Sequence, residues 1–491
     1  MRPSAAGCVA RLQLTNETPP PPHGQSKMSA WCYVLAWAAV LAEQLLHVPH
    51  AGDFAGIAIL AFLLLEFRNQ RRYAQILFLA LLGIGLLGVV LADDRLALFL
   101  AGWRRGASYA AFFLALTTLR DAAETSPLVR RCGQHLVAQP PGRRYAALTA
   151  GGHVFGITLS YGAIELLGAM VMRANTLEAA GGSAEIRTIR TRRMLLAIYR
   201  GFCVMNCWSP INIMTAVVST AVPAAPMRLL LPIAFVVAVG MAALGWIEDR
   251  LSGARLQTRG GVRPDTTERW SIHLRTIALV LLVMLLAEAS AAVFQISLVA
   301  AVTLIVPLIA TGWIVVQGWR FAGRGGVLLF GLLQRRAHRF LLRIPTIRSE
   351  ATVLGGSGFM AVAIGNVLPH TGLSPLVAAL PPVTIPLLVP VLLIATGQIG
   401  LNPVAVVALV GAVIPNAAAL GIPPAVLAFA CMLGWGLGVT MTPMSSSAII
   451  TARWAETSPW TVTTRWNAPF TFSALLLAWA AILAAFMLWP R

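Results

Sequence analysis

The chain has 491 residues, of which 58% are hydrophobic and only 11% are charged, and its mean hydropathy is +0.76. Soluble domains carry about 25% charged residues, so this composition excludes a soluble protein and predicts an all-α polytopic membrane protein. The formal net charge of +19 lies largely in arginines between apolar segments, as in cytoplasmic loops that contact anionic lipid headgroups. We therefore expect the lipid bilayer, and no nucleic acid, as the partner of these charges.

The apolar segments divide the chain into four parts. Residues 1–28 are polar and proline-rich and are predicted to be a disordered N-terminal tail. Windows of about 20 apolar residues, enough for one helix to cross a bilayer, recur beyond this tail and indicate about 11–13 membrane segments. They form a first membrane repeat over 29–250 and a second over 276–491, joined by a cytoplasmic linker over 251–275.

The apolar run Tyr145–Met172 is rich in glycine and has basic connections on both sides. A single crossing cannot begin and end on the same side of a membrane, so the run is predicted to be a re-entrant hairpin. Two ionisable residues within it, His153 and Glu165, are candidate site residues because such groups are costly at membrane depth. Alternatively, each lies near the interface or is hydrogen bonded to a backbone carbonyl.

A polar patch interrupts the next apolar segment, Met194–Val222. The proline in this patch removes a backbone donor and leaves carbonyls without helical partners, and these groups must be satisfied by protein, water or a ligand. The candidate binding residues of the patch are Ser209, Pro210, Asn212 and Thr215. The alternative is an ordinary proline kink, whose hydroxyls bond back to the preceding turn.

The second half of the chain carries a similar series of features. The glycine-rich run Ala351–Leu373, with Asn366 as a candidate site residue, is predicted to be the second re-entrant hairpin. A proline-interrupted pair of segments around Gln398 and Asn402 is interpreted as turn-forming. The second break follows, and its candidate binding residues are Thr442, Pro443, Ser445, Ser446 and Ser447.

The order of these features indicates a duplicated unit. Three pairs of motifs occur in the same order in both halves: Arg130-Arg131 and Arg335-Arg336, Gly151–Phe155 and Gly355–Phe359, and Ser209-Pro210 and Thr442-Pro443. Interrupted helices at equivalent places in two halves are typical of transporter binding sites. An inverted repeat would place the two basic arms on opposite sides of the membrane, so the inverted and the parallel arrangement both stay open.

Each break offers two kinds of binding group. Freed carbonyls and hydroxyls are hard oxygen ligands, so sodium is the one ion expected, at Ser209, Thr442 and Ser446, with no other metal and no cofactor. A helix that begins after a break points its positive end and free N–H groups at the gap, which suits a carboxylate or an oxyanion. The predicted solute is therefore a small anion.

These motifs resemble the ion transporter superfamily, which includes divalent anion/sodium symporters, arsenite-permease-like carriers and citrate carriers. The shared features are two repeats, a re-entrant hairpin in each, and a following helix broken by a short Ser/Asn/Thr motif. In this chain, Ser209–Asn212 and Thr442–Ser445 occupy the places of that motif. The Ser-Asn-Thr triplet itself is not present, because Pro210 intervenes and serines replace Asn-Thr in the second copy. The resemblance implies a homodimer whose hairpin domains move as elevators.

The predicted function is secondary active transport of an organic acid or oxyanion across the cytoplasmic (inner) membrane, by symport with sodium or protons. The sequence has no ATP-binding loop, and the protein is not expected to be an enzyme. One alternative is a membrane-embedded enzyme for lipid-linked substrates, for which His47, His50 and Asp53 form the densest external cluster. The other is a non-catalytic membrane scaffold.

Overall fold

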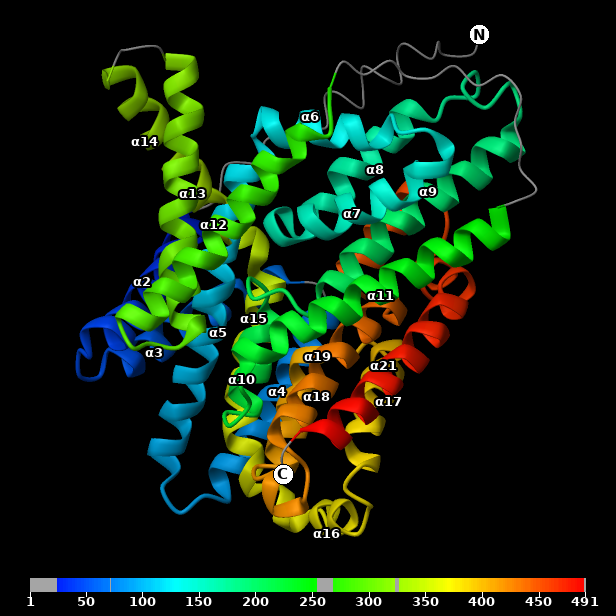
Figure 1. Cartoon of the computed structure of the whole chain (residues 1–491). Coiled ribbons are helices and arrows are strands. Elements are labelled where there is room, and N and C mark those ends of the chain that lie inside the picture. The colour runs from blue at the N-terminus through cyan, green and yellow to red at the C-terminus, as the bar shows by residue number, and fades with distance from the viewer. Residues whose placement is uncertain (1–23, 71, 254–267, 323–325, 490–491) are drawn as a thin grey trace.

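The computed structural model describes residues 24–70, 72–253, 268–322 and 326–489, and every regular element within them is a helix (Figure 1). Seven of the described helices are long and apolar enough to cross a membrane, which confirms the predicted all-α polytopic membrane fold. Residues 24–28, predicted to end the disordered tail, are helical, whereas residues 1–23 of the tail and 254–267 of the linker lie outside the described residues.

A first group of helices forms a scaffold around one buried helix. Its members are α2 (Gly24–Leu46), α3 (Ala51–Glu66), the 3-10 turn η1 (Phe67–Asn69), α4 (Arg72–Val90), α5 (Arg95–Glu124) and the central α15 (Arg348–Ala363). A Cβ on Gly358 of α15 would lie 2.6 Å from the Cα of Gly106 on α5. Only small residues let two helices approach this closely, so the glycines hold α15 directly against α5.

The first half continues with a surface arm, a hairpin and a broken helix. These elements are α6 (Pro127–Val137), α7 (Pro141–Leu159), α8 (Gly162–Ala174), α9 (Ala184–Met205), α10 (Ile213–Ala221) and α11 (Met227–Gly253). α7 and α8 turn at Ser160 and Tyr161, inside the run that was predicted to be a hairpin. α9 and α10 are separated by the Ser209-Pro210 patch, so the first helix break lies where the proline predicts it.

Three helices connect the halves, and the second half follows. The connecting helices are α12 (Ser271–Val293), α13 (Leu298–Ala322) and α14 (Gly326–Arg343). Around α15 and beyond lie η2 (Ile344–Ile347), η3 (Ile364–Asn366), η4 (Leu368–His370), α16 (Leu373–Ala378), α17 (Thr384–Gln398), α18 (Pro403–Val413), η5 (Ala418–Leu420), α19 (Pro424–Met441), α20 (Ser446–Trp454), the π-helix η6 (Thr461–Trp466) and α21 (Ala468–Leu488).

The prediction of a hairpin over Ala351–Leu373 is wrong. Its glycine-rich part lies in the single helix α15, where the glycines serve helix packing and not a bend. The second hairpin is formed by α17 and α18. These helices turn around Gly400, whose φ of +86° is a conformation that favours glycine.

Two inner helices, α9 and α19, carry the breaks. In the apolar window of the span that contains α19 and α20, 89% of the residues are buried, whereas the share is 22–39% in the other six candidate spans. The inner helices are tied together directly, because the Tyr199 hydroxyl on α9 donates to the Val439 carbonyl on α19 at 2.9 Å. Both breaks therefore open into the interior of the protein.

Candidate functional site

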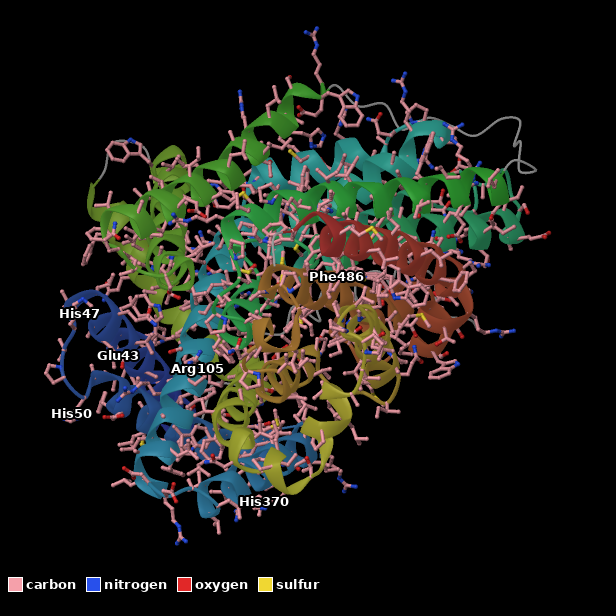
Figure 2. All side chains as sticks on the ribbon, turned by 60° about the horizontal axis from the view of Figure 1, so that its bottom comes forward. Glu43, His47, His50, Arg105, His370 and Phe486 are labelled. Atoms are coloured by element: carbon pink, nitrogen blue, oxygen red, sulfur yellow. The ribbon has the colours of Figure 1, made fainter. Side chains whose placement is uncertain are left out.

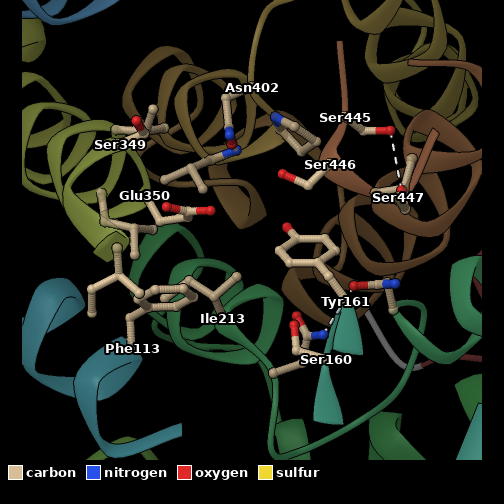
Figure 3. Close-up of a pocket in the computed structure, with 18 of the residues that line it drawn as sticks. Phe113, Ser160, Tyr161, Ile213, Ser349, Glu350, Asn402, Ser445, Ser446 and Ser447 are labelled. Atoms are coloured by element: carbon tan, nitrogen blue, oxygen red, sulfur yellow. Dashed lines mark hydrogen bonds between the residues drawn. The ribbon is translucent and has the colours of Figure 1, made fainter. Parts of the chain in front are cut away.

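A cavity of about 460 Å³ lies where the two hairpin tips meet the two helix breaks (Figure 3). Its remaining walls come from the start of α4, the end of α5 and the first turn of α15. The volume falls within the range of about 300–1,000 Å³ that is common for small-molecule sites. The cavity thus brings together segments from both halves of the chain.

Each helix that follows a break is capped by a side chain of the break. In the first break, Asn212 Oδ1 accepts from the Met214 backbone N–H at 2.9 Å, and Asn212 Nδ2 donates to Asn206 Oδ1 at 2.9 Å. In the second break, Ser445 Oγ accepts from the Ala448 N–H at 3.2 Å and donates to the Thr442 carbonyl at 2.8 Å. Asn and Ser are preferred caps, so the polar residues of the breaks define where α10 and α20 begin.

Carbonyls freed by the breaks find partners from other elements or from the next turn. Gln398, at the end of α17, donates to the Met441 carbonyl at the end of α19. Thr215 Oγ1 donates to the Ser209 carbonyl at 2.8 Å. Side-chain hydrogen bonds therefore stabilise both breaks.

The hairpin tips begin two more helices at the cavity. At the second tip, Asn402 Oδ1 accepts from the Val404 N–H at 2.9 Å and caps α18, while Tyr73 of α4 donates its hydroxyl to the Gly400 carbonyl. At the first tip, Ser160 has a φ of +50° and Tyr161 precedes α8 without a side-chain cap. The N-termini of α8, α10, α18 and α20 consequently all border one cavity. Each carries a partial positive charge of about half a unit.

Three charged residues line the cavity: Arg120, Arg348 and Glu350. Arg120 pairs with Glu124 at 2.7 Å. Arg348 pairs at 3.0 Å with Glu66, whose side chain is only 1% exposed. The Glu350 carboxylate points into the cavity from the first turn of α15 (Figure 3).

The structure brings part of the predicted site together. The predicted residues that line the cavity are Asn212, Thr442, Ser445, Ser446 and Ser447. Pro210, Pro443, Ser209 and Thr215 lie next to these in the breaks but are not among its lining residues. The Ser209 hydroxyl is fully buried and has no hydrogen-bond partner among the described residues.

Three other predicted residues lie away from the cavity lining. His153 Nε2 accepts from Trp208 Nε1 at 2.8 Å, and Glu165 forms an ion pair with Arg453 of α20. Asn366 donates to the Gly88 carbonyl at 3.4 Å, in the contact between η3 and α4. Asn366 was predicted to lie in the second re-entrant hairpin, but its segment is the end of α15 and η3.

Sequence reasoning missed several lining residues. Tyr161 and Arg120 were not singled out, and Asn402 was interpreted only as a turn former. Glu350 was not singled out either, although it is the only acidic residue in the basic segment Arg320–Glu350. A second signal was the Asn402-Pro403 pair, since Asn followed by Pro is typical of a helix start.

The cluster that suggested a membrane-embedded enzyme contains His50 and Asp53, which belong to a network of ion pairs. Arg104 bridges Asp53 at 2.7 Å and Glu43 at 3.3 Å, and His50 contacts Asp53 at 3.3 Å while its side chain is 89% exposed. Figure 2 shows Glu43, His47 and His50 at one edge of the molecule. Among the described residues, no group of three or more His, Cys, Asp or Glu side chains is arranged to hold a metal ion.

No protein-family model and no curated protein matches this chain. Among solved structures, the chain is similar to the crystal structure of the YdaH transporter from Alcanivorax borkumensis, with a TM-score of 0.54 and 15% sequence identity. The match covers 83% of this chain and 98% of that chain. The two proteins thus share the fold of a polytopic membrane transporter. The ion transporter superfamily and the homodimer that it implies stay predictions.

Proposed function

We propose that this protein is a secondary active transporter that moves a small anion, an organic acid or an oxyanion, across the cytoplasmic membrane in symport with sodium or protons. The observation that carries the proposal is the convergence of four helix N-termini, two from hairpins and two from broken helices, on one cavity. The likeness in fold to a transporter adds support.

The helix N-termini favour a negatively charged solute. Their N–H groups and partial positive charges are aimed at a shared space, as in known anion sites at helix starts. The hydroxyl of Ser446 and the amide of Asn402 point into the same space and add hydrogen-bonding groups (Figure 3). An anion with several oxygen atoms would satisfy more of these groups than an apolar solute would.

The position of the cavity indicates the side on which the solute enters. Arg120 and Glu124 lie at the end of α5 with side chains 37% and 31% exposed. The arm α6, which carries Arg130 and Arg131, begins directly after this end. Basic segments prefer the cytoplasmic side, so we propose that the cavity is open toward the cytoplasm.

Two observations bear on the coupling ion. The buried Ser209 hydroxyl, which has no hydrogen-bond partner in the part of the chain that the structure describes, is a candidate sodium ligand together with oxygens of the first break. Glu350, in the cavity itself, is a candidate proton-binding group. Both fit symport.

Uptake into proteoliposomes tests the proposal. The purified protein is reconstituted, and a panel of radiolabelled organic and inorganic anions is offered under an imposed sodium or proton gradient. Ser446→Ala, which removes a hydroxyl from the cavity, is compared with Ser473→Ala, a matched change on α21 whose hydroxyl bonds to the Phe470 carbonyl at 2.9 Å.

We expect at least one anion to accumulate, with a higher KM in Ser446→Ala than in Ser473→Ala. Loss of one hydrogen bond to a charged group costs about 1.5–3 kcal/mol, or roughly 10- to 150-fold in affinity. The proposal fails if no anion moves. The assignment of the site fails if both variants behave like the wild type.

A further inference from the structure

We propose that a small pocket between α7, α9 and α11 binds the phosphate group of an anionic membrane lipid, and that Arg144 holds this phosphate. No described residue lines both this pocket and the solute cavity. The lipid site is therefore a second site, and it does not depend on which solute the protein carries.

The pocket has the size of one small polar group. Its walls come from the first turn of α7, the first half of α9 and the end of α11, and its volume is about 70 Å³. One water needs roughly 10–15 Å³ of such space, so the pocket holds about five to seven non-hydrogen atoms. This suits a single phosphate group and is well below the range of about 300–1,000 Å³ for sites that enclose a whole small molecule.

Arg144 brings a positive charge to this pocket. Its Nε donates to the Gln139 carbonyl at 2.7 Å, and its Nη1 lies 3.9 Å from Met194 Sδ. Neither partner is charged, and no Asp or Glu of the described chain forms an ion pair with Arg144. The charge that acts on it is that of Arg190, which repels it. A guanidinium has several N–H donors, so Arg144 keeps donors for a ligand.

The acidic residue of the lining, Asp249, is already bound elsewhere. Arg193 Nε and Nη2 donate to its two carboxylate oxygens at 2.7 Å each, in the bidentate geometry that arginine favours. Arg190 also lines the pocket and donates to the Ala179 carbonyl at 2.6 Å. The N-terminus of α7, which borders the pocket, adds partial positive charge. A bound oxyanion would therefore relieve the repulsion between Arg144 and Arg190.

The course of α11 places the pocket at the level of the lipid headgroups. The middle of this helix exposes apolar side chains, among them Val236 and Val239, as expected for a surface that faces acyl chains. Trp246 follows and is partly exposed, with Arg250 lying over its ring at 5.0 Å. Tryptophan is enriched at the membrane–water interface. Asp249 comes one helical turn, about 5 Å, beyond Trp246, so the pocket lies just outside the apolar layer.

This position favours a lipid over a free phosphate ion. The acyl chains of a lipid would lie along the exposed apolar face of α11 while its phosphate enters the pocket. The pocket is also close to the basic arm α6, which ends shortly before α7 begins. Basic segments prefer the cytoplasmic side, whose leaflet carries anionic lipids, and basic pockets between membrane helices on that side bind anionic headgroups.

Native mass spectrometry of the full-length protein in detergent provides the first test. Phosphatidylglycerol is the anionic probe, and phosphatidylcholine with the same acyl chains is the neutral one. Arg144→Gln is compared with Arg143→Gln, a matched change at the neighbouring exposed arginine, which does not line the pocket. We expect one tightly bound phosphatidylglycerol in the wild type and in Arg143→Gln, and an affinity at least about tenfold lower in Arg144→Gln.

The second test separates lipid binding from folding. Because Arg144 also bonds to the Gln139 carbonyl, the unfolding temperature without lipid measures the loss of that contact alone. Added phosphatidylglycerol should then raise the unfolding temperature of the wild type and of Arg143→Gln but not that of Arg144→Gln. Arg144→Lys keeps the charge without the planar fork, so its affinity for the lipid should lie between those of the wild type and Arg144→Gln. This variant carries the test if Arg144→Gln does not fold.

Three results overturn the proposal. The first is equal affinity for phosphatidylglycerol in Arg144→Gln and Arg143→Gln, or in Arg144→Lys and the wild type where Arg144→Gln does not fold. The second is binding of phosphatidylcholine as tight as that of phosphatidylglycerol. The third is stabilisation by inorganic phosphate that equals that by phosphatidylglycerol and requires Arg144, since the ligand would then be a free anion. Each result leaves the proposed transport function untouched, because no step of either test involves transport.

Discussion

Arg200 holds four elements together near the end of α9 that leads into the first break. Its guanidinium donates to Asn467 Oδ1 at 2.8 Å, to the Tyr145 hydroxyl at 3.1 Å and to Glu248 Oε1 at 3.1 Å. It also lies 4.6 Å from the centre of the Phe470 ring. The side chain is 4% exposed, so Arg200→Met should destabilise the protein by removing all of these contacts at once.

The loss in the free energy of unfolding depends on whether each former partner of Arg200 can find a replacement partner. Asn467 is fully buried, and its unpaired oxygen costs about 1–3 kcal/mol. Glu248 is 30% exposed, so water can replace the lost partner and its share is small. The lost contact with the aromatic ring adds about 0.5–2 kcal/mol. We therefore expect the free energy of unfolding to fall by about 2–4 kcal/mol, near the range of about 3–5 kcal/mol for a broken buried ion pair.

A second substitution separates the energetic cost of the unpaired Asn467 oxygen from the cost of losing the other contacts. Asn467→Leu in the Arg200→Met background removes that oxygen, while the Thr440 carbonyl that Asn467 also contacts keeps the Tyr199 hydroxyl at 3.2 Å. The double variant should regain about 1–2 kcal/mol relative to Arg200→Met. The matched control is Arg250→Met, which removes an exposed contact to a carbonyl and should cost less than about 1 kcal/mol.

Unfolding of the purified protein can be followed by a thiol-reactive dye, because three buried cysteines lie in the inner helices or in the first break: Cys203, Cys207 and Cys431. The reasoning is refuted if Arg200→Met unfolds no more easily than Arg250→Met. It is also refuted if the losses from Arg200→Met and Asn467→Leu simply add in the double variant.

Three further predictions concern packing, the surface arm and a helix cap. Gly358→Ala should destabilise the protein by about 1–3 kcal/mol because the new Cβ meets the α5 backbone, whereas Gly312→Ala, which meets nothing within 4 Å, should be neutral or stabilising by up to about 1 kcal/mol in the same dye assay. Burial lowers the pKa of His135 on α6, so the folded state favours the neutral imidazole. The free energy of unfolding should keep its full value above the unfolded pKa of about 6.5 and fall as the pH drops below it. At about pH 5, it should have fallen less in His135→Gln than in the wild type. Asn402→Ala should cost about 1 kcal/mol by removing the cap of α18, and proteolysis at the second hairpin tip should increase, with Asn402→Ser restoring the wild-type pattern.

The breaks could be predicted from sequence because their cause is local. Proline removes a backbone donor and weakens a helix, and Asn212 and Ser445 stand two or three residues before the N–H groups that they cap. The first hairpin could be predicted because basic segments flank it on both sides. In these cases the signal lies within a few residues of the feature that it predicts.

The second hairpin and the charged wall of the cavity could not be predicted in this way. Glycines that bend a chain and glycines that let helices touch look alike in sequence, and those of α15 belong to the second kind, because Gly106 lies against them. Likewise, the Gln70–Thr352 hydrogen bond that anchors α15 spans 282 residues. The place of Glu350 depends on such contacts, which no local pattern records.

The cavity divides its charges between two walls. Arg120, Arg348 and Glu350 all belong to α5 and α15 of the scaffold, whereas the four helix N-termini belong to the hairpins and the broken helices. An anion held by the N-termini would therefore change its distance from Glu350 whenever one wall moves relative to the other.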